Sequence, residues 1–401
     1  MRRLAMLLLI GLIAAGCQSD RLVNPTGTGA PSSDALAAGG PDYRLPPPGA
    51  PGLRIMTYNV YLGTDFSPVI AAGSVQDFLT ATARAYGELQ QTNFPARAGK
   101  IADQIAAARP DVVGLEEVGI WSVSSPYAPG GPPLVPFVVQ YDFLQLVLDS
   151  LAARHLAYRA AAADTTSDVA APVPTAFDGQ GNPTAFALIR FQDRDAIIVR
   201  AGVRWRDARH GVYTAFIPLD LQGTQTGEYR GWSSIEALAD GRAIRIVDSH
   251  LEADDGQVNL AQAQEQLGLL RNETDPVVWV GDFNSGPGVT SDFASTYALV
   301  TGSSFTDLWP LAHPRDPGLT NGPADGVGAL DANGVLVPYP TLVFTTRVDL
   351  VLLRDAGGRP HDLHAAIFGD RPDDRTAGGL YPSDHAAVGM VFDLPFGLAG
   401  R

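Results

Sequence analysis

Six short segments of this 401-residue sequence place acidic, amide or imidazole side chains at or beside apolar runs that are typical of buried strands. The segments are Met56–Asn59, Pro110–Val118, Val247–Leu251, Val278–Asn284, Thr346–Val351 and Ser383–Val388. A carboxylate at the end of a buried strand costs several kcal/mol of folding free energy unless it is paired or bound to a metal ion. These residue types in these positions therefore indicate acid–base or metal-ion chemistry.

Each segment taken alone also has a structural explanation. Asn59 at the end of a strand suits a turn, and a single histidine such as His250 is more often structural than catalytic. In the most distinctive segment, an apolar run leads into Gly281, Asp282 and Asn284. The glycine there permits a tight turn, after which the two polar side chains point to the same edge. The weight of the pattern comes from the presence of all six segments in one chain.

Together and in this order, the segments resemble those of the endonuclease/exonuclease/phosphatase superfamily, which has the deoxyribonuclease I-like fold. The resemblance extends from residue 53 to residue 388. It implies a divalent cation held by oxygen ligands, for which Mg²⁺ or Mn²⁺ is favoured over zinc. It also implies that Glu117 is the principal metal ligand, that Asn59 lies beside it, and that Asp384 is a second ligand or acts through water. The chain departs from the family at Glu116, where glutamine is usual.

The other site residues have catalytic roles in this resemblance. Asp282 and Asn284 are expected to orient the attacking water and a phosphate oxygen. Asp349 is expected to hydrogen-bond His385, which then acts as a base or as a cation that stabilises the transition state. His250 is expected to contact a phosphate oxygen or to serve as an acid. The implied reaction is hydrolysis of a phosphoester, in which the cation neutralises the anionic oxygens that otherwise repel a nucleophile.

The elements that must position these residues can be read from the apolar patterns. Strands are expected at 53–60, 112–115, 185–190, 196–203, 212–218, 243–249, 276–280, 347–353 and 387–392, and helices at 97–109, 138–154, 258–271 and 290–299. Stretches rich in glycine and proline at 122–136 and 310–340 predict long loops. Many strands with polar ends and few helices predict an α/β fold with two sheets packed face to face and helices outside. With the resemblance, this gives a four-layer α/β sandwich of two packed mixed sheets flanked by helices.

The first fifty residues predict export and a lipid anchor. Arg2 and Arg3 precede an apolar run that is too short to span a membrane, and the run ends at Ala14-Ala15-Gly16-Cys17. This resembles a bacterial lipoprotein signal, which implies a signal peptide at residues 1–16 and acylation of Cys17, the single cysteine of the chain. Residues 17–50 are rich in Gly, Pro and Ser and predict a flexible tether before the catalytic domain at residues 51–395. The expected location is the outer membrane or the outer face of the cytoplasmic membrane.

The sequence leaves the substrate open. The favoured interpretation is a phosphodiesterase that acts on nucleic acid or on a phospholipid headgroup. The alternatives are a phosphomonoesterase acting on sugar or inositol phosphates and an inactive membrane-tethered binding protein of the same fold. The net charge of −15 argues against non-specific binding of nucleic acid, and the complete set of site residues argues against an inactive protein. We expect a monomer, anchored to the membrane, that hydrolyses a phosphoester.

Overall fold

Two six-stranded sheets face each other in the computed structural model, which describes residues 44–239, 241–290, 292–323, 326–355 and 358–394. The first sheet has the strand order β19 (His361–Phe368), β20 (Ala387–Asp393), β1 (Leu53–Asn59), β2 (Val112–Glu116), β8 (Ala196–Arg200) and β5 (Tyr158–Ala163). The second has the order β15 (Thr306–Asp307), β18 (Asp349–Arg354), β14 (Val277–Asp282), β13 (Arg242–His250), β12 (Gly231–Ala239) and β9 (Arg204–Val212). Both sheets are mixed, because β1 and β14 each have one parallel and one antiparallel neighbour.

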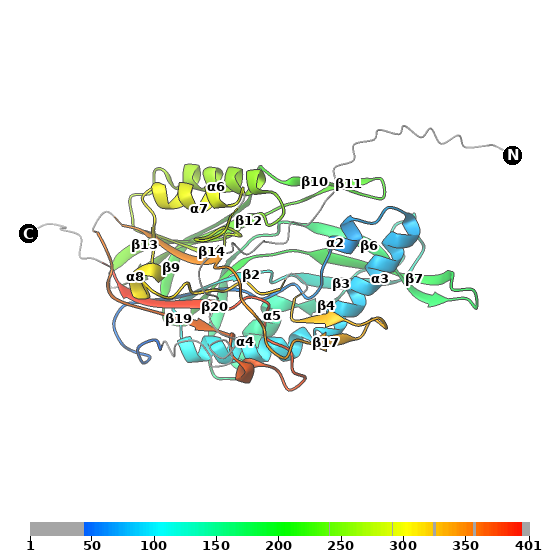
Figure 1. Cartoon of the computed structure of the whole chain (residues 1–401), viewed down its shortest axis with the longest axis horizontal. Coiled ribbons are helices and arrows are strands. Elements are labelled where there is room, and N and C mark those ends of the chain that lie inside the picture. The colour runs from blue at the N-terminus through cyan, green and yellow to red at the C-terminus, as the bar shows by residue number, and fades with distance from the viewer. Residues whose placement is uncertain (1–43, 240, 291, 324–325, 356–357, 395–401) are drawn as a thin grey trace, which may run out of the picture. The chain divides into compact units, whose positions relative to one another are not determined.

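Helices cover the outer face of each sheet, so the fold has four layers (Figure 1). The first sheet carries α4 (Phe94–Ala108) and α5 (Phe143–Ala152), and the second carries α6 (Gly256–Leu270) and α7 (Ala294–Gly302). Between the sheets lies an apolar layer to which Ile55 and Val112 contribute from one side and Ile246 and Val280 from the other. Because the central strands are buried on both faces, their sequences are continuously apolar. The predicted four-layer α/β sandwich is confirmed.

The ends of α4 follow from its sequence. Pro95 occupies the first turn, where a backbone N–H is not needed, and Ile101 and Ile105 are spaced to face the first sheet. Arg109 has the left-handed conformation with φ of 46°, and Pro110 follows, so the helix cannot continue. The helix predicted at 97–109 is therefore confirmed, except that it begins three residues earlier and ends one residue earlier.

Two predicted elements are wrong in kind over part of their length, and the helix predicted at 290–299 begins four residues later, as α7. The helix predicted at 138–154 begins only at Phe143, because Val138–Asp142 forms the strand β4. Asp142 caps the helix by accepting a hydrogen bond from the backbone N–H of Gln145 at 3.1 Å. The strand predicted at 212–218 is interrupted, because β9 ends at Val212 and the next strand begins at Ile217. In both segments a strand pairs with a neighbouring strand, β4 with β3 and β10 with β11, and the apolar pattern alone does not reveal this pairing.

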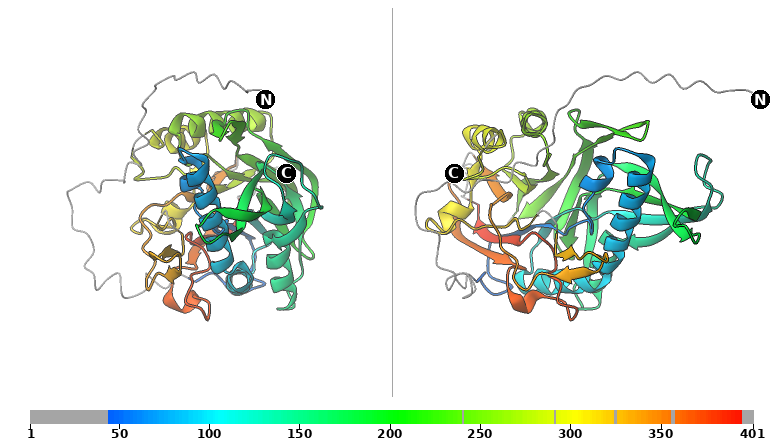
Figure 2. Two further views of the ribbon diagram at one scale, coloured as in Figure 1. Left: turned by 90° about the vertical axis from the view of Figure 1, so that its right-hand side faces the viewer. Right: turned by 45° about the vertical axis from the view of Figure 1, so that its right-hand side comes forward.

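A further sheet and two helices extend the sandwich; of these elements, only the strand at 185–190 was predicted, and it lies within β7 (Pro183–Gln192). The sheet has the order β4, β3 (Ile120–Tyr127), β7 and β6 (Asp168–Phe177). Beside it lie α2 (Ser67–Ile70), α3 (Val75–Gln91) and the hairpin of β10 (Ile217–Leu221) and β11 (Thr224–Glu228), as Figure 2 shows. The loop predicted at 122–136 belongs partly to β3. The loop predicted at 310–340 includes the end of α8 (Trp309–Ala312) and the small hairpin of β16 (Gly328–Leu330) and β17 (Leu336–Pro338).

The predicted signal peptide at 1–16, the acylated Cys17 and most of the tether at 17–50 lie outside the described residues, as does residue 395 of the predicted domain. The described residues belong to one unit, Pro41–Arg401. Within them, none of the helices combines the length and the apolar character that crossing a bilayer requires.

Candidate active site

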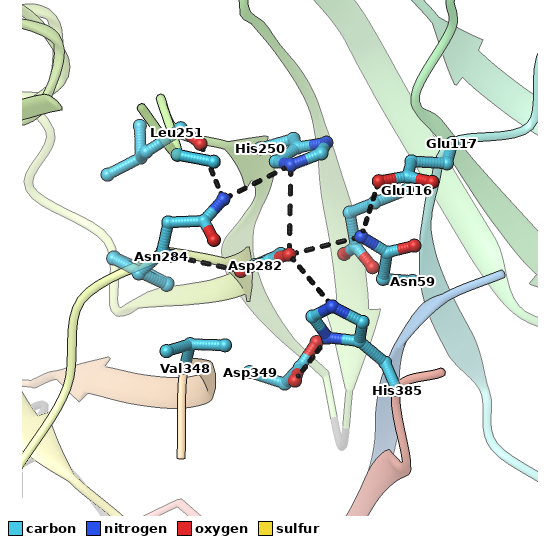
Figure 3. A network of polar contacts seen from close by, with 12 residues as sticks. Asn59, Glu116, Glu117, His250, Leu251, Asp282, Asn284, Val348, Asp349 and His385 are labelled. Atoms are coloured by element: carbon cyan, nitrogen blue, oxygen red, sulfur yellow. Dashed lines mark hydrogen bonds and ion pairs between the residues drawn. The ribbon is translucent and has the colours of Figure 1, made fainter. Parts of the chain in front are cut away.

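The strand register places the predicted site residues at one edge of the sandwich. Asn59 lies opposite Glu116 at the carboxyl ends of β1 and β2, and His250 lies opposite Asp282 at the carboxyl ends of β13 and β14. Asp282 also lies opposite Asp349, the first residue of the antiparallel strand β18. Because β1 packs against β14 and β18 across the apolar layer, the polar ends of the two sheets meet (Figure 3).

Asn59 joins the two sheets. Its side-chain Nδ2 donates hydrogen bonds to Glu117 Oε1 and to Asp282 Oδ2, both at 3.0 Å, and its Oδ1 accepts one from the backbone N–H of Tyr61. Glu117 and Asp282, from different sheets, are thereby held around one buried amide. The NH₂ group of Asn59 faces both carboxylates, so binding a cation through the amide oxygen requires the amide to turn over.

Glu117 is aimed into the site by the turn that ends β2. Its backbone has a φ of 64°, a left-handed conformation that costs a residue other than glycine about 1–3 kcal/mol. Two hydrogen bonds hold it there: the backbone N–H of Leu62 donates to Oε2 at 2.6 Å, and the N–H of Glu117 donates to Asp195 Oδ1 at 3.1 Å. The strain is therefore located at the residue that was predicted to bind the metal.

His385 forms an acid–base pair with Asp349. Its Nδ1 lies 2.9 Å from Asp349 Oδ2, and its Nε2 lies 3.7 Å from Asp282 Oδ2. Burial opposes a charge on the imidazole, but the two carboxylates outweigh burial and raise the pKa of His385 well above its usual range. The predicted contact between Asp349 and His385 is present, with Asp349 orienting the ring and favouring its charged form.

His250 occupies the opposite side of Asp282. Its Nε2 lies 3.7 Å from Asp282 Oδ2, and its Nδ1 lies 3.8 Å from Asp195 Oδ1. Burial and the nearby Arg230, whose Nη1 is 3.2 Å from Nε2, disfavour the imidazolium, yet the two carboxylates raise the pKa of His250 to about 9. Asn284 contacts the same ring, with its Nδ2 at 3.3 Å from Nε2. Asp282 thus lies between two imidazoles that favour the charged form.

Gly281 is needed for a reason other than the predicted tight turn. It lies inside β14 with φ of 142°, and a Cβ added to it would lie 1.9 Å from the backbone oxygen of Ser249 on β13. Only glycine permits this close approach of the two backbones. The chain turns later, at Asn284, which has a φ of 47° and donates its backbone N–H to Asp282 Oδ1 at 2.9 Å. That turn brings both polar side chains to the same edge.

Arg97 ties together two loops that carry site residues. Its guanidinium is fully buried and donates to the backbone oxygens of Val60, at 2.7 Å, and Pro382, at 2.8 Å. Val60 follows Asn59, and Pro382 precedes Ser383, Asp384 and His385. Burial lowers the pKa of Arg97 to about 10. Arg97 therefore fixes the position of one loop relative to the other.

Asp384, a predicted metal ligand, lies in the second of these loops. Its Oδ1 is 3.2 Å from Ser383 Oγ. Burial raises the pKa of Asp384 to about 6; His385 opposes the rise and the charge of Glu117 adds to it. Of the three predicted metal ligands, Asn59 and Glu117 are in direct contact. Asp384 interacts with Glu117 through the repulsion between their two negative charges.

The balance of charge at this edge fits a hard divalent cation. Several buried carboxylates face one another there, and Asp349 Oδ1 has no hydrogen-bond partner among the described residues. Oxygen ligands of this kind suit Mg²⁺ or Mn²⁺. Ligand atoms of Asp282, Asp349 and His385 also lie within 4.8 Å of one another. Since His385 is hydrogen-bonded to Asp349, we interpret that trio as acid–base groups rather than as metal ligands.

Glu116, which departs from the family pattern, faces a second buried acid. Thr57 donates a hydrogen bond to Glu116 Oε1 at 2.7 Å, while Glu116 Oε2 and both oxygens of Asp248 have no partner among the described residues. Asp248 has room because its neighbour across the sheets is Gly114, where a Cβ would lie 2.4 Å from Asp248 Oδ1. Burial, together with the charge of Asp248, raises the pKa of Glu116 well above its usual range, and burial also raises that of Asp248.

Glu116→Gln is expected to stabilise the protein at neutral and alkaline pH. The raised pKa of Glu116 means that folding favours the protonated acid, so its contribution to stability is present at low pH and is lost as the pH rises. Glutamine avoids that loss, which corresponds to about 1–3 kcal/mol for an unsatisfied buried group. Urea unfolding at pH 5 and pH 8 should show the gain mainly at pH 8. Exposed Asp149→Asn is the control, and an equal or lower stability of Glu116→Gln at pH 8 would contradict this expectation.

Three residues that the structure places at the site have no role predicted from the sequence: Asp195, Arg230 and Arg97. Asp195 directly precedes β8 and is 1% exposed, and Arg230 directly precedes β12 and is also buried. A charged residue at the beginning of an apolar strand was the available signal for these two. Arg97 lies on the buried face of a helix, where an arginine is unusual, and that was its signal.

Comparisons with known proteins agree with the sequence motifs. A sequence model of the Endonuclease/Exonuclease/phosphatase family matches residues 56–385. No curated protein sequence gives a significant match. Among solved structures, a humanized D. rerio TDP2 is 18% identical, with a TM-score of 0.46, and the match covers 85% of this chain and 99% of that chain. An endonuclease/exonuclease/phosphatase from Beutenbergia cavernae DSM 12333 is 18% identical, with a TM-score of 0.44, and the match covers 86% of this chain and 72% of that chain.

Proposed function

Because this chain belongs to the endonuclease/exonuclease/phosphatase family, we propose that it is a divalent-metal-dependent phosphodiesterase that attacks phosphorus with an activated water molecule. One observation carries the proposal: Asp282 Oδ2 lies 3.0 Å from Asn59 Nδ2 and 3.7 Å from a ring nitrogen of both His250 and His385. A carboxylate between two imidazoles can orient a water molecule and share its proton with a neighbouring group.

We propose that Glu117, Asn59 and Asp384 hold Mg²⁺, or Mn²⁺ in its place. A bound cation would neutralise the phosphate oxygens and the leaving oxygen. The support is the carboxylate oxygens of Glu117 and Asp384, which the amide oxygen of Asn59 would join once the amide turns over, and the unbalanced negative charge of the buried carboxylates, of which the raised pKa of Asp384 is one sign. Binding of a cation beside Glu117 would relieve that repulsion.

The remaining residues orient and move protons. Asp349 holds the Nδ1 of His385, which leaves Nε2 facing Asp282 and available to a water molecule or a phosphate oxygen. His250 and Asn284, on the other side of Asp282, would bind a phosphate oxygen, with the pKa of about 9 favouring the imidazolium form of His250. Arg230 lies beside His250 and adds a further positive charge there.

The test is hydrolysis of bis(p-nitrophenyl) phosphate and of p-nitrophenyl phosphate by the purified protein. We expect hydrolysis of the diester, its loss in EDTA and its return with Mg²⁺ or Mn²⁺. Activity on the monoester alone would favour the alternative of a phosphomonoesterase acting on sugar or inositol phosphates. No activity on either compound with any divalent metal would overturn the proposal in favour of an inactive binding protein.

We also propose that the protein is exported and anchored to the cell envelope through an acylated Cys17. The support is the position of the single cysteine directly after an apolar run that ends in small residues. We expect Cys17→Ser to shift the protein from the membrane fraction to the soluble fraction of expressing bacterial cells, as detected by immunoblotting. An unchanged distribution between the two fractions would show that the anchor is absent.

A further inference from the structure

An apolar cavity of about 200 Å³, open to solvent, lies beside the candidate active site. Its outer walls come from the elements that extend the sandwich: α2 and α3, the edge strand β6, and the β10–β11 hairpin. Residues on these walls include Ile70, Ala85, Ala171 and Leu221. Ile70 is 39% exposed, which leaves a large apolar side chain facing water at the rim.

The inner end of the cavity is formed by residues of the site itself. Glu117 and Arg230 both line it. Leu62, another lining residue, donates its backbone N–H to Glu117 Oε2 at 2.6 Å, and Arg230 Nη1 lies 3.2 Å from His250 Nε2. A phosphate group held between Glu117 and His250 would therefore have the cavity directly next to it.

The floor between the inner end and the walls is aromatic. Phe66 stacks on Trp121 with ring centroids 5.7 Å apart, and Phe191 packs against Trp121 at 4.5 Å. This packing fixes the floor as a preformed apolar surface. Preformed surfaces of this kind bind apolar groups without the entropic cost of ordering the protein.

The lining suits an aliphatic chain better than a nucleobase. A base edge carries several hydrogen-bond donors and acceptors, each of which costs free energy when it is buried without a partner. Among the charged lining residues, Arg230 belongs to the site, and it donates a hydrogen bond to Glu228 Oε1 at 2.7 Å. Of the polar groups on the outer walls, the Thr82 hydroxyl is already bonded to the backbone oxygen of Pro172 at 2.9 Å. The net charge of −15 also disfavours a polyanionic ligand.

We propose that this cavity binds the aliphatic chain of a lipid-like phosphodiester whose phosphate lies in the active site. The inference rests on the proposed function and adds a substrate class to it: a diester with an alkyl or acyl chain on one side of the phosphate. The cavity selects that chain by burying its methylene groups, while the residues around Asp282 contact only the phosphate.

The test is calorimetric titration of the protein with a series of methyl alkyl phosphates, from methyl butyl phosphate to methyl octyl phosphate, in EDTA, where we expect no hydrolysis. We expect the Kd to fall about fourfold for each methylene that is buried, until the chain fills the cavity. A Kd that does not depend on chain length would overturn the inference. So would tighter binding of thymidine 5′-methyl phosphate than of methyl octyl phosphate.

Two variants on the cavity walls sharpen the test. Leu221→Gln and Ile70→Gln should each weaken the binding of methyl octyl phosphate by about tenfold, because a polar amide would be buried against the chain. The binding of methyl butyl phosphate should change much less. Leu269→Gln, at an exposed leucine on α6, is the matched control and should change neither Kd. Unchanged binding of the octyl diester by both wall variants would overturn the inference.

The outcome for the cavity is independent of the outcome for the reaction. If the Kd depends on chain length but no diester is hydrolysed, the inference that the cavity binds the chain stands and the proposed phosphodiesterase activity is rejected. If the protein hydrolyses bis(p-nitrophenyl) phosphate but its Kd does not depend on chain length, the proposed phosphodiesterase activity stands and the cavity is not a chain-binding site.

Discussion

Glu117→Gln is expected to lower kcat for bis(p-nitrophenyl) phosphate by about 10²- to 10³-fold and to weaken the binding of Mg²⁺. Glutamine keeps the size of the side chain and an oxygen that can accept the hydrogen bond from the N–H of Leu62. It removes the negative charge that we propose to hold the cation. The expected loss of activity would therefore result from the missing negative charge and not from a change in the shape of the side chain. The measurements are kcat as a function of Mg²⁺ concentration and calorimetric titration with Mg²⁺.

A matched control for this variant is available on α6. Glu265 accepts a hydrogen bond from the backbone N–H of Thr214, as Glu117 does from Leu62, but it lies away from the site. Glu265→Gln should leave kcat and the Mg²⁺ affinity unchanged. If Glu117→Gln retained normal activity and an unchanged affinity for Mg²⁺, Glu117 would not be the principal ligand. Thermal unfolding should show that both variants are folded.

The site residues that could be predicted from the sequence are those at the ends of strands. Asn59 and Asp282 each end an apolar run, so their chemistry and their place at a sheet edge could be inferred without a structure. Their contact could not, because 223 residues separate them and the register between β1 and β14 is set by packing of two different sheets. The family resemblance supplied the expectation that they meet.

The residues that were missed share a different property. Asp195 and Arg230 are charged, and their partners, Glu117 and His250, lie 78 and 20 residues away in the sequence. A charged residue at the start of a strand is usually exposed, so its burial becomes evident only when the partner is known. The cavity could not be predicted for a similar reason, because it becomes evident only when the elements that form its walls, α2, α3, β6 and β10, are seen together. The periodicity of α3, with Phe78, Ala81, Ala85 and Leu89 buried, could have been recognised in the sequence.

The replacement of His385 by glutamine should lower kcat by about 10²- to 10⁴-fold. Glutamine can still hydrogen-bond Asp349, but it can neither accept a proton from water nor carry a positive charge near neutral pH. The loss is expected whether His385 acts as a base or as a cation. A rate within tenfold of the unaltered protein would exclude both roles. The variant should bind Mg²⁺ normally, since His385 is not proposed to be a ligand, and this distinguishes it from Glu117→Gln.

Asp349→Asn separates the two roles through the pH dependence of kcat/KM. Asp349 and Asp282 raise the pKa of His385, so removing the charge of Asp349 lowers that pKa. If His385 is the base, activity falls as the pH decreases through its pKa, and this acid limb should move to lower pH in Asp349→Asn. If His385 acts as a cation, activity falls as the pH increases through the same pKa, and the alkaline limb should move to lower pH instead. A profile in which neither limb moves would show that His385 does not titrate in the reaction.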